Sequence, residues 1–189
     1  MVDYTDDITP SIAVLREGGL LIYPTDTVWG IGCDATNAQA VEKIFSLKQR
    51  PSQKSMIVLL ADAHELPKYV AKLPENIIPL LESFTTPTTV IYQGAMHLAA
   101  NAINEDGSIA IRIVQDDFCQ ALIRQFGRPI ISTSANLSGQ ATPALFKDIA
   151  SQLLDGVDYI VKHRQDDPVP RGASRIVTMD TEGQLVYIR

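Results

Sequence analysis

Short apolar runs alternate with amphipathic segments along most of the chain. The runs are brief enough for β-strands, and residues 56–61 are apolar throughout, as expected for a strand buried on both faces. Between the runs, apolar residues such as Val41, Ile44 and Phe45 recur at helical spacing. The apolar runs are residues 20–23, 28–33, 56–61, 88–92, 108–112, 129–131 and 158–161. Strands that alternate with helices predict an α/β fold.

Threonine and proline mark three predicted helix starts. Thr9-Pro10 and Thr142-Pro143 each combine a good N-cap residue with proline at the first helical position, so we expect a helix after each pair. The second of these helices should end at Gly156. Thr36 is expected to cap the helix that leads to Lys48.

The last part of the chain predicts a β-hairpin. Residues 174–179 and 185–188 have the pattern of its two strands, joined around Glu182-Gly183. An antiparallel hairpin makes the predicted sheet mixed. No repeat, low-complexity tract or linker interrupts the 189 residues, a length that suits one core, so we expect a single domain over residues 1–189.

The charge balance restricts how this protein could bind nucleic acid. Its 16 Lys and Arg residues stand against 22 Asp and Glu residues, and a net charge of −6 argues against nucleic-acid binding over the whole surface, although not against a local basic pocket. Cys33 and Cys119 lie in apolar surroundings and are interpreted as buried thiols of a cytoplasmic protein. No Cys or His pair has the spacing of zinc ligands, and no apolar run is long enough for a membrane span.

Three cations surround a proline at the end of the predicted helix. Pro51 disfavours the helical conformation for Arg50, so Lys48 and Arg50 can point to the same place, although residues two apart on a continuous helix do not. Basic residues in a last helical turn also complement the helix dipole, which is their commoner explanation. That explanation does not account for Lys54, in the loop beyond the helix. We therefore interpret the three cations as part of a site for an anionic ligand.

A second polar cluster follows the apolar run at residues 129–131. If this strand stays extended, Ser132, Ser134 and Asn136 project to one side. They lie at the carboxyl end of a strand, where open α/β sheets bind ligands. Alternatively, the cluster is a polar turn whose side chains bond to the local backbone. Together with the cation cluster, we favour the ligand site.

Two further features have open interpretations. Gly30 and Gly32 leave one face of their strand without side chains, either for close packing or for the approach of a ligand, and the sequence favours neither. Arg112 lies late in an apolar strand and shares a face with Ser108. An arginine in such a place needs a partner, which in the simplest interpretation is a structural carboxylate.

Three motifs in this order resemble those of one family. YPTDTVWGIGCD at residues 23–34, KQRPSQK at residues 48–54 and STSANLSG at residues 132–139 look like the motifs of the YrdC/TsaC family of threonylcarbamoyl-AMP synthases. The resemblance extends from about Gly18 to Arg189. It implies a twisted, mixed α/β sheet with flanking helices around one large concave cavity. It also implies a nucleotidyltransferase that condenses L-threonine, bicarbonate and ATP into threonylcarbamoyl-AMP and releases pyrophosphate.

The resemblance assigns roles to the residues at matching positions. Threonine contacts are implied for Thr27, Arg112, Ser132 and Ser174. ATP contacts are implied for Lys48, Arg50, Lys54, Ser108, Ser134, Asn136, Thr142 and Arg189, with Lys48 and Arg50 as the catalytic cations. Magnesium is expected to reach the site mainly on the ATP phosphates, without a dedicated protein site. Charge that develops on phosphate oxygens calls for positioned cations and for no covalent nucleophile.

The resemblance implies partners and leaves two alternatives. A threonylcarbamoyl transferase complex would pass the group to the adenosine beside the tRNA anticodon, so tRNA would be an indirect partner. One alternative is a module that binds double-stranded RNA or tRNA without synthase activity. The other is a carbamoyl-adenylate former of the hydrogenase-maturation type. The chain departs from the family pattern at Ala173-Ser174-Arg175, where Glu-Ser-Thr is usual, and at Leu59, where histidine is frequent.

Overall fold

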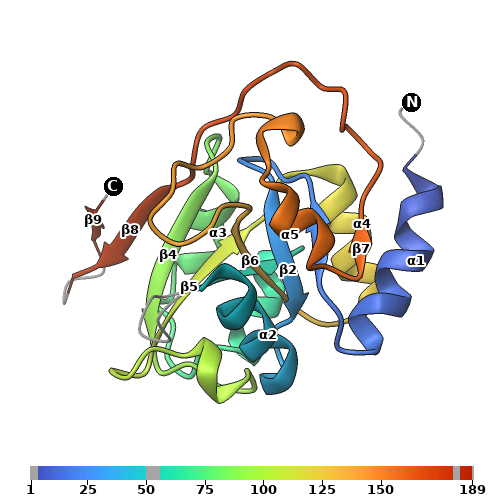
Figure 1. Ribbon diagram of the computed structural model, residues 1–189. Helices are drawn as coiled ribbons and strands as arrows, with labels where there is room; N and C mark the ends of the chain where they lie inside the picture. Colours follow the sequence, from blue (N-terminus) through green and yellow to red (C-terminus); the bar gives the residue numbers. More distant parts are fainter. Residues whose placement is uncertain (1–3, 50–55, 181–183, 189) are drawn as a thin grey trace.

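The computed structural model describes residues 4–49, 56–180 and 184–188, and within them nine strands form one sheet in the order β7-β1-β2-β6-β3-β5-β4-β8-β9 (Figure 1). The strands are β1 (Leu21–Tyr23), β2 (Gly30–Asp34), β3 (Ile57–Leu60), β4 (Thr88–Gln93), β5 (Ser108–Ile113), β6 (Ile130–Ser134), β7 (Tyr159–Ile160), β8 (Arg175–Met179) and β9 (Leu185–Tyr187). The α-helices are α1 (Thr5–Arg16), α2 (Ala38–Lys48), α3 (Ile77–Glu82), α4 (Asp117–Phe126) and α5 (Ser151–Asp155). The short 3-10 helices are η1 (Ala63–Lys68), η2 (Ala100–Ala102) and η3 (Phe146–Asp148).

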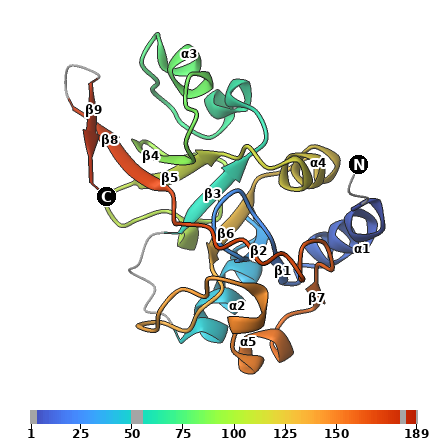
Figure 2. The same ribbon diagram turned by 90° about the horizontal axis from the view of Figure 1, so that it is seen from above.

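The sheet is mixed. The pairs β1–β7, β3–β5 and β4–β8 are parallel, and the pairs β1–β2, β2–β6, β3–β6, β4–β5 and β8–β9 are antiparallel. Figure 2 shows the strand direction turning from β1 and β2 toward β8 and β9, as the twist of L-residues requires. The predicted α/β class with a twisted mixed sheet is confirmed. The antiparallel pairing of the last two strands is confirmed too, while the turn expected at Glu182-Gly183 lies outside the described residues.

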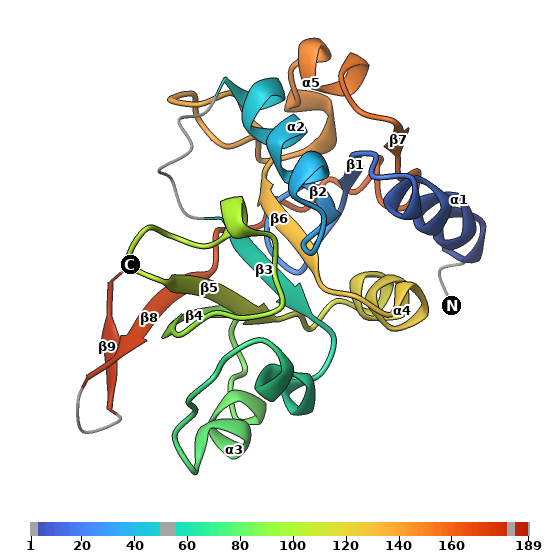
Figure 3. The same cartoon turned by 90° about the horizontal axis from the view of Figure 1, so that it is seen from below.

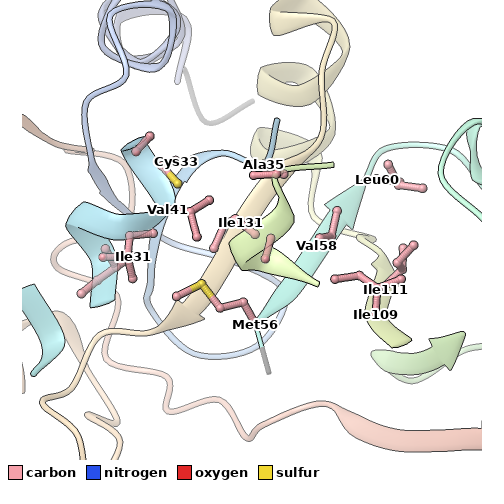
Figure 4. Close-up of a cluster of buried hydrophobic side chains, with 14 of the residues drawn as sticks. Ile31, Cys33, Ala35, Val41, Met56, Val58, Leu60, Ile109, Ile111 and Ile131 are labelled. Carbon is pink, nitrogen blue, oxygen red and sulfur yellow. The ribbon is translucent and has the colours of Figure 1, made fainter. Parts of the chain in front are cut away.

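The two faces of the sheet are covered to different extents. On one face, Ile31, Val58 and Ile111 belong to a continuous apolar core that includes residues of α2 (Figure 4). On the opposite face, α1 and α4 lie side by side over one end of the strands, where Tyr23 and Leu59 are buried (Figure 3). Side chains alternate between the two faces of the sheet. The second face therefore carries further side chains that α1 and α4 do not cover. These side chains form the floor of a cavity.

Helix α1 begins at Thr5, so the start predicted at Thr9-Pro10 is wrong and Pro10 lies inside the helix. A tertiary contact accounts for the earlier start. The buried Asp7 carboxylate accepts the Tyr159 hydroxyl at 2.7 Å and two backbone N–H groups that follow β7. These contacts fasten the first turn of α1 to the sheet edge, which a local capping signal cannot reveal.

The other two predicted helix starts are also wrong. Asn37 caps α2 by accepting two N–H groups of the first turn, whereas the Thr36 hydroxyl donates to Asp34 at 2.7 Å. At Thr142-Pro143 no helix begins within the described residues, because the chain there runs along the cavity wall, and α5 starts only at Ser151. The predicted end of that helix at Gly156 is confirmed.

Asp7→Ala is expected to lower the free energy of unfolding by about 3 kcal/mol, because it removes a buried acceptor and leaves the donors without a partner. Urea unfolding at neutral pH measures this loss. Asp6→Ala is the matched control, since Asp6 lies in the same turn but is exposed, and it should change the free energy by no more than about 0.5 kcal/mol. Equal losses in both variants would contradict the structural role of Asp7.

Candidate active site

A cavity of about 320 Å³ opens over the uncovered part of the sheet. Its volume lies at the lower end of the range of roughly 300–1,000 Å³ found for small-molecule sites. The floor follows the strand register, because Ser132 on β6 pairs with Ile57 on β3, which pairs with Ala110 on β5. Six predicted site residues line the cavity together: Thr27, Arg112, Ser132, Ser134, Thr142 and Ser174.

Arg112 brings a buried positive charge to this cavity. Its side chain is 3% exposed, and its Nη2 lies 3.2 Å from Oδ1 of the buried Asp26. The other Asp26 oxygen accepts the Gln115 backbone N–H at 3.1 Å. Within the described part of the chain, Nε of Arg112 has no hydrogen-bond partner. An unmet buried donor costs about 1–3 kcal/mol. Because Arg112 also lines the cavity, its guanidinium is a candidate partner for an anionic group of a ligand.

Thr27 reaches the cavity from the turn between β1 and β2. The Thr25 hydroxyl donates to the Val28 carbonyl at 2.8 Å, accepts the Thr27 N–H at 3.0 Å and lies 2.9 Å from the Thr27 hydroxyl. Arg164 donates to the Thr25 carbonyl at 2.8 Å and pairs with Asp116 at 2.9 Å. The turn is therefore held from both sides. Sequence reasoning missed the part of Arg164, since its partners lie far away along the chain.

The two glycines of β2 have different neighbours. A Cβ at Gly30 would lie 2.9 Å from Oγ of Ser132, at the wall of the cavity. A Cβ at Gly32 would lie 2.6 Å from the Ile131 carbonyl oxygen and 2.6 Å from the Tyr23 ring. Gly32 permits close packing. Gly30 also packs closely, against Ser132, but it lies at the cavity wall, and the approach of a ligand to its backbone stays a prediction.

Ser174 enters the cavity just before β8. Its hydroxyl lies at hydrogen-bond distance, 2.8 Å, from the hydroxyl of the buried Thr89. Thr89 pairs in register with Arg112, so β4 and β5 place both beside the cavity. Sequence reasoning missed Thr89. The alternation along β4 was a usable signal, because it places Thr89 on the same face as the cavity residue Ile91.

Lys48 lies at the end of α2 and is only 2% exposed. Its ammonium donates to the carbonyl oxygens of Ser134 and Asn136, the latter at 2.6 Å. The cavity lining does not include Lys48. The contact between this side chain and a triphosphate stays a prediction.

The remaining predicted site residues fall into two groups. The buried Ser108 hydroxyl accepts from the Asn104 amide at 2.8 Å, and the Asn136 amide donates to the Leu137 and Gln140 carbonyls, both at 2.9 Å. Asn136 therefore makes the local backbone bonds of the alternative interpretation. Three further predicted site residues lie outside the described residues: Arg50, Lys54 and Arg189.

The described residues offer no protein-held metal site, since no group of three or more His, Cys, Asp or Glu side chains among them could hold an ion. The polar side chains that line the cavity are hydroxyls and the Arg112 guanidinium. This donor set fits magnesium that is held by substrate phosphates and water. In the part of the chain that the structure describes, no helix has the length and apolar character needed to cross a membrane.

Both cysteines are buried thiols. Burial raises the pKa of Cys33 and of Cys119 above the ordinary value of a thiol. The Cys119 thiol also donates to the Pro24 carbonyl at 3.2 Å. Thiols that stay protonated are poor nucleophiles, so covalent catalysis through either cysteine is disfavoured.

The two glycines generate a stability prediction. Gly32→Ala should lower the free energy of unfolding by about 3 kcal/mol or more, because its Cβ would meet a backbone carbonyl that cannot move freely. Gly30→Ala should cost about 1 kcal/mol, because the nearest atom is the end of the Ser132 side chain, which can rotate. Chemical unfolding of both variants measures the difference, and a greater loss at Gly30 would contradict these assignments.

Both the sequence and the fold are similar to those of known proteins. The family model Sua5_yciO_yrdC, described as telomere recombination, matches residues 13–189. A protein of Pseudoalteromonas translucida (strain TAC 125), named threonylcarbamoyl-AMP synthase, is 34% identical over 165 residues, which are 86% of each chain.

Solved structures share the fold over nearly the whole chain. Sua5 of P. abyssi, in complex with L-threonine, has a TM-score of 0.86 at 25% identity and covers 100% of this chain, which spans 55% of that one. Full-length HypF, in the phosphate- and nucleotide-bound form, has a TM-score of 0.81 at 24% identity over 96% of this chain and 28% of its own. With the match over residues 13–189, these findings confirm the resemblance of the three motifs: the chain belongs to the Sua5/YciO/YrdC family.

Proposed function

We propose that this protein is a threonylcarbamoyl-AMP synthase, a nucleotidyltransferase that condenses L-threonine, bicarbonate and ATP and releases pyrophosphate. The observation that carries the proposal is the buried Arg112 guanidinium, whose Nε has no partner among the described residues, in a cavity lined with hydroxyl groups. The P. translucida relative has this name, and its similarity covers 86% of the chain. Membership of the family and the chemistry of the cavity therefore support one function.

The threonine is proposed to bind at the Arg112 end of the cavity. The forked guanidinium of Arg112, which lines the cavity, suits a carboxylate. The hydroxyls of Thr27, Ser132 and Ser174 line the same cavity and are proposed to bind the other polar groups of the amino acid. Sua5 of P. abyssi has been solved in complex with L-threonine, which supports threonine as a ligand of this fold.

ATP is proposed to lie toward the end of β6. Ser134, the last residue of β6, and Thr142, which follows it along the chain, line the cavity there. The other proposed ATP contacts are Arg50, Lys54, Ser108, Asn136 and Arg189. Of these, Ser108 and Asn136 make local hydrogen bonds in the structure, which they would have to share with or exchange for the nucleotide.

The proposed chemistry needs no covalent intermediate with the protein. The threonine amine attacks the carbon of bicarbonate and water leaves, which gives an N-carboxylated threonine. A carboxylate oxygen then forms a bond to the α-phosphorus of ATP, the bond from that phosphorus to the β-bridging oxygen breaks, and pyrophosphate leaves with the electron pair. The protein would contribute orientation of the two substrates and positive charge near the phosphate oxygens.

Magnesium, partners, location and domain organisation belong to the same proposal. Magnesium bound to the ATP phosphates would neutralise part of their charge. The product would pass through a threonylcarbamoyl transferase complex to tRNA, in the cytoplasm. Residues 1–189 are proposed to form one domain.

Pyrophosphate release is the direct test, and it should require L-threonine, bicarbonate and magnesium-ATP together. Arg112→Lys should raise the KM for threonine by about 10-fold, because lysine keeps the charge but loses the forked donors, a loss of about 1.4 kcal/mol. The KM for ATP should change by less than about threefold, since ATP is placed at the other end of the cavity. A coupled assay for pyrophosphate measures both values.

Arg128→Lys is the matched control for this variant. Arg128 also pairs with a buried aspartate, Asp34, at 2.9 Å, but its own side chain is 59% exposed and lies away from the cavity lining. Both KM values should stay unchanged. Pyrophosphate release that does not depend on any amino acid would contradict the synthase function. Release that requires carbamoyl phosphate would favour the carbamoyl-adenylate alternative. Salt-sensitive RNA binding without any release would favour the RNA-binding alternative.

A further inference from the structure

Lys48 joins the end of α2 to the segment that follows β6. We call residues Ser134–Ser138 the β6 loop. The Lys48 ammonium donates to the carbonyls of Ser134 and Asn136, and the Lys48 backbone carbonyl accepts the Ser138 N–H at 3.0 Å. Lys48 thus forms hydrogen bonds with both ends and the middle of the β6 loop. These bonds connect two motifs that are far apart in the sequence.

The β6 loop is folded so that its carbonyls converge on the ammonium. The Asn136 N–H donates to the Ser134 carbonyl, and the Ala135 N–H donates to the Trp29 carbonyl, both at 2.9 Å. A lysine that is 2% exposed keeps its charge only if acceptors replace the water that it loses. The carbonyls of Ser134 and Asn136 are such acceptors. The burial of the Lys48 ammonium therefore depends on the conformation of the β6 loop, and that conformation depends on the ammonium.

We propose that Lys48 is a positioning residue, which acts through the β6 loop instead of binding the triphosphate itself. The inference rests on the proposed function, because the nucleotide is placed against this loop. Ser134 lines the cavity and Lys48 does not, so the ammonium acts on the cavity through the Ser134 carbonyl.

The geometry also explains why a lysine is required. An ammonium is compact, and its three donors can rotate to meet two carbonyls that lie close together. A guanidinium is planar and larger, and it would have to push the loop away from α2. Arginine at position 48 should therefore keep the charge without restoring the loop. The Lys48→Arg variant therefore distinguishes a positioning role of Lys48 from a requirement for positive charge alone.

Binding of adenosine, AMP and magnesium-ATP to the wild type and to Lys48→Met distinguishes the two roles. Trp29, the one tryptophan of the chain, bonds to the β6 loop through its carbonyl and offers a fluorescence signal for the titrations. If Lys48 positions the loop, all three ligands should lose affinity by the same factor, about 10-fold. A loss that is absent for adenosine and grows with the number of phosphates would overturn the proposal, because it would show direct contact with phosphate.

Hydrogen exchange provides a second readout that needs no ligand. In Lys48→Met, the amides of residues 134–138 should exchange at least about 10-fold faster, while the core amides of β3 keep their protection. Lys48→Arg should show the same acceleration, and it serves as the comparison if Lys48→Met fails to fold. Unchanged exchange in the loop would contradict the proposal.

Lys43→Met is the matched control on the same helix. Lys43 also donates to a backbone carbonyl, that of Gly18 at 2.8 Å, but it is exposed and lies away from the cavity. This variant should bind all three ligands as the wild type does. A wild type that binds none of them would refute the proposed function, whereas the exchange experiment would still decide whether Lys48 holds the loop.

Discussion

Arg112 is buried on β5 with Asp26 beside its Nη2, and among the described residues its Nε has no acceptor. Folding has to offset the cost of removing this charge from water, and the single carboxylate does so only in part. Because Arg112 lines the cavity, an anionic group of a ligand there would add a second partner for the guanidinium. The Arg112 side chain is thus positioned by Asp26 before a ligand binds, and its charge favours an anionic ligand. The hydroxyls of Thr27, Ser132 and Ser174 surround this charge and can refine the selection.

The sheet can present this arginine because its second face is only partly covered. Helices α1 and α4 bury one end of that face, and the strand alternation continues past them into open space. Gly30 leaves room beside Ser132, and the turn that carries Thr27 is tied down by Thr25 and Arg164. Where ATP is proposed to bind, Lys48 donates hydrogen bonds to two carbonyls of the β6 loop. The strands, the turn that carries Thr27 and the β6 loop thus position the residues of the site.

Sequence patterns predicted the strands and the shared face of Ser132 and Ser134, because these depend on the two-residue period of a strand. Tertiary contacts decided the rest. A cap contributes about 1 kcal/mol, so the Thr9-Pro10 signal did not outweigh the contacts of Asp7 with the region after β7. Gly30 and Gly32 look alike in sequence and differ only in their cross-strand neighbours. The acceptors of Lys48 lie 86 and 88 residues further along the chain, where no local pattern indicates them.

The central claim is that the guanidinium of Arg112 binds the carboxylate of threonine. Calorimetric titration of the wild type with L-threonine and with L-threoninol, which replaces the carboxylate by an alcohol, tests it most directly. The account predicts that L-threonine binds and that L-threoninol binds at least about 100-fold more weakly, because a charge-assisted pair contributes up to about 3 kcal/mol. Equal binding of both ligands would contradict the account, since the cavity would then recognise threonine without its carboxylate.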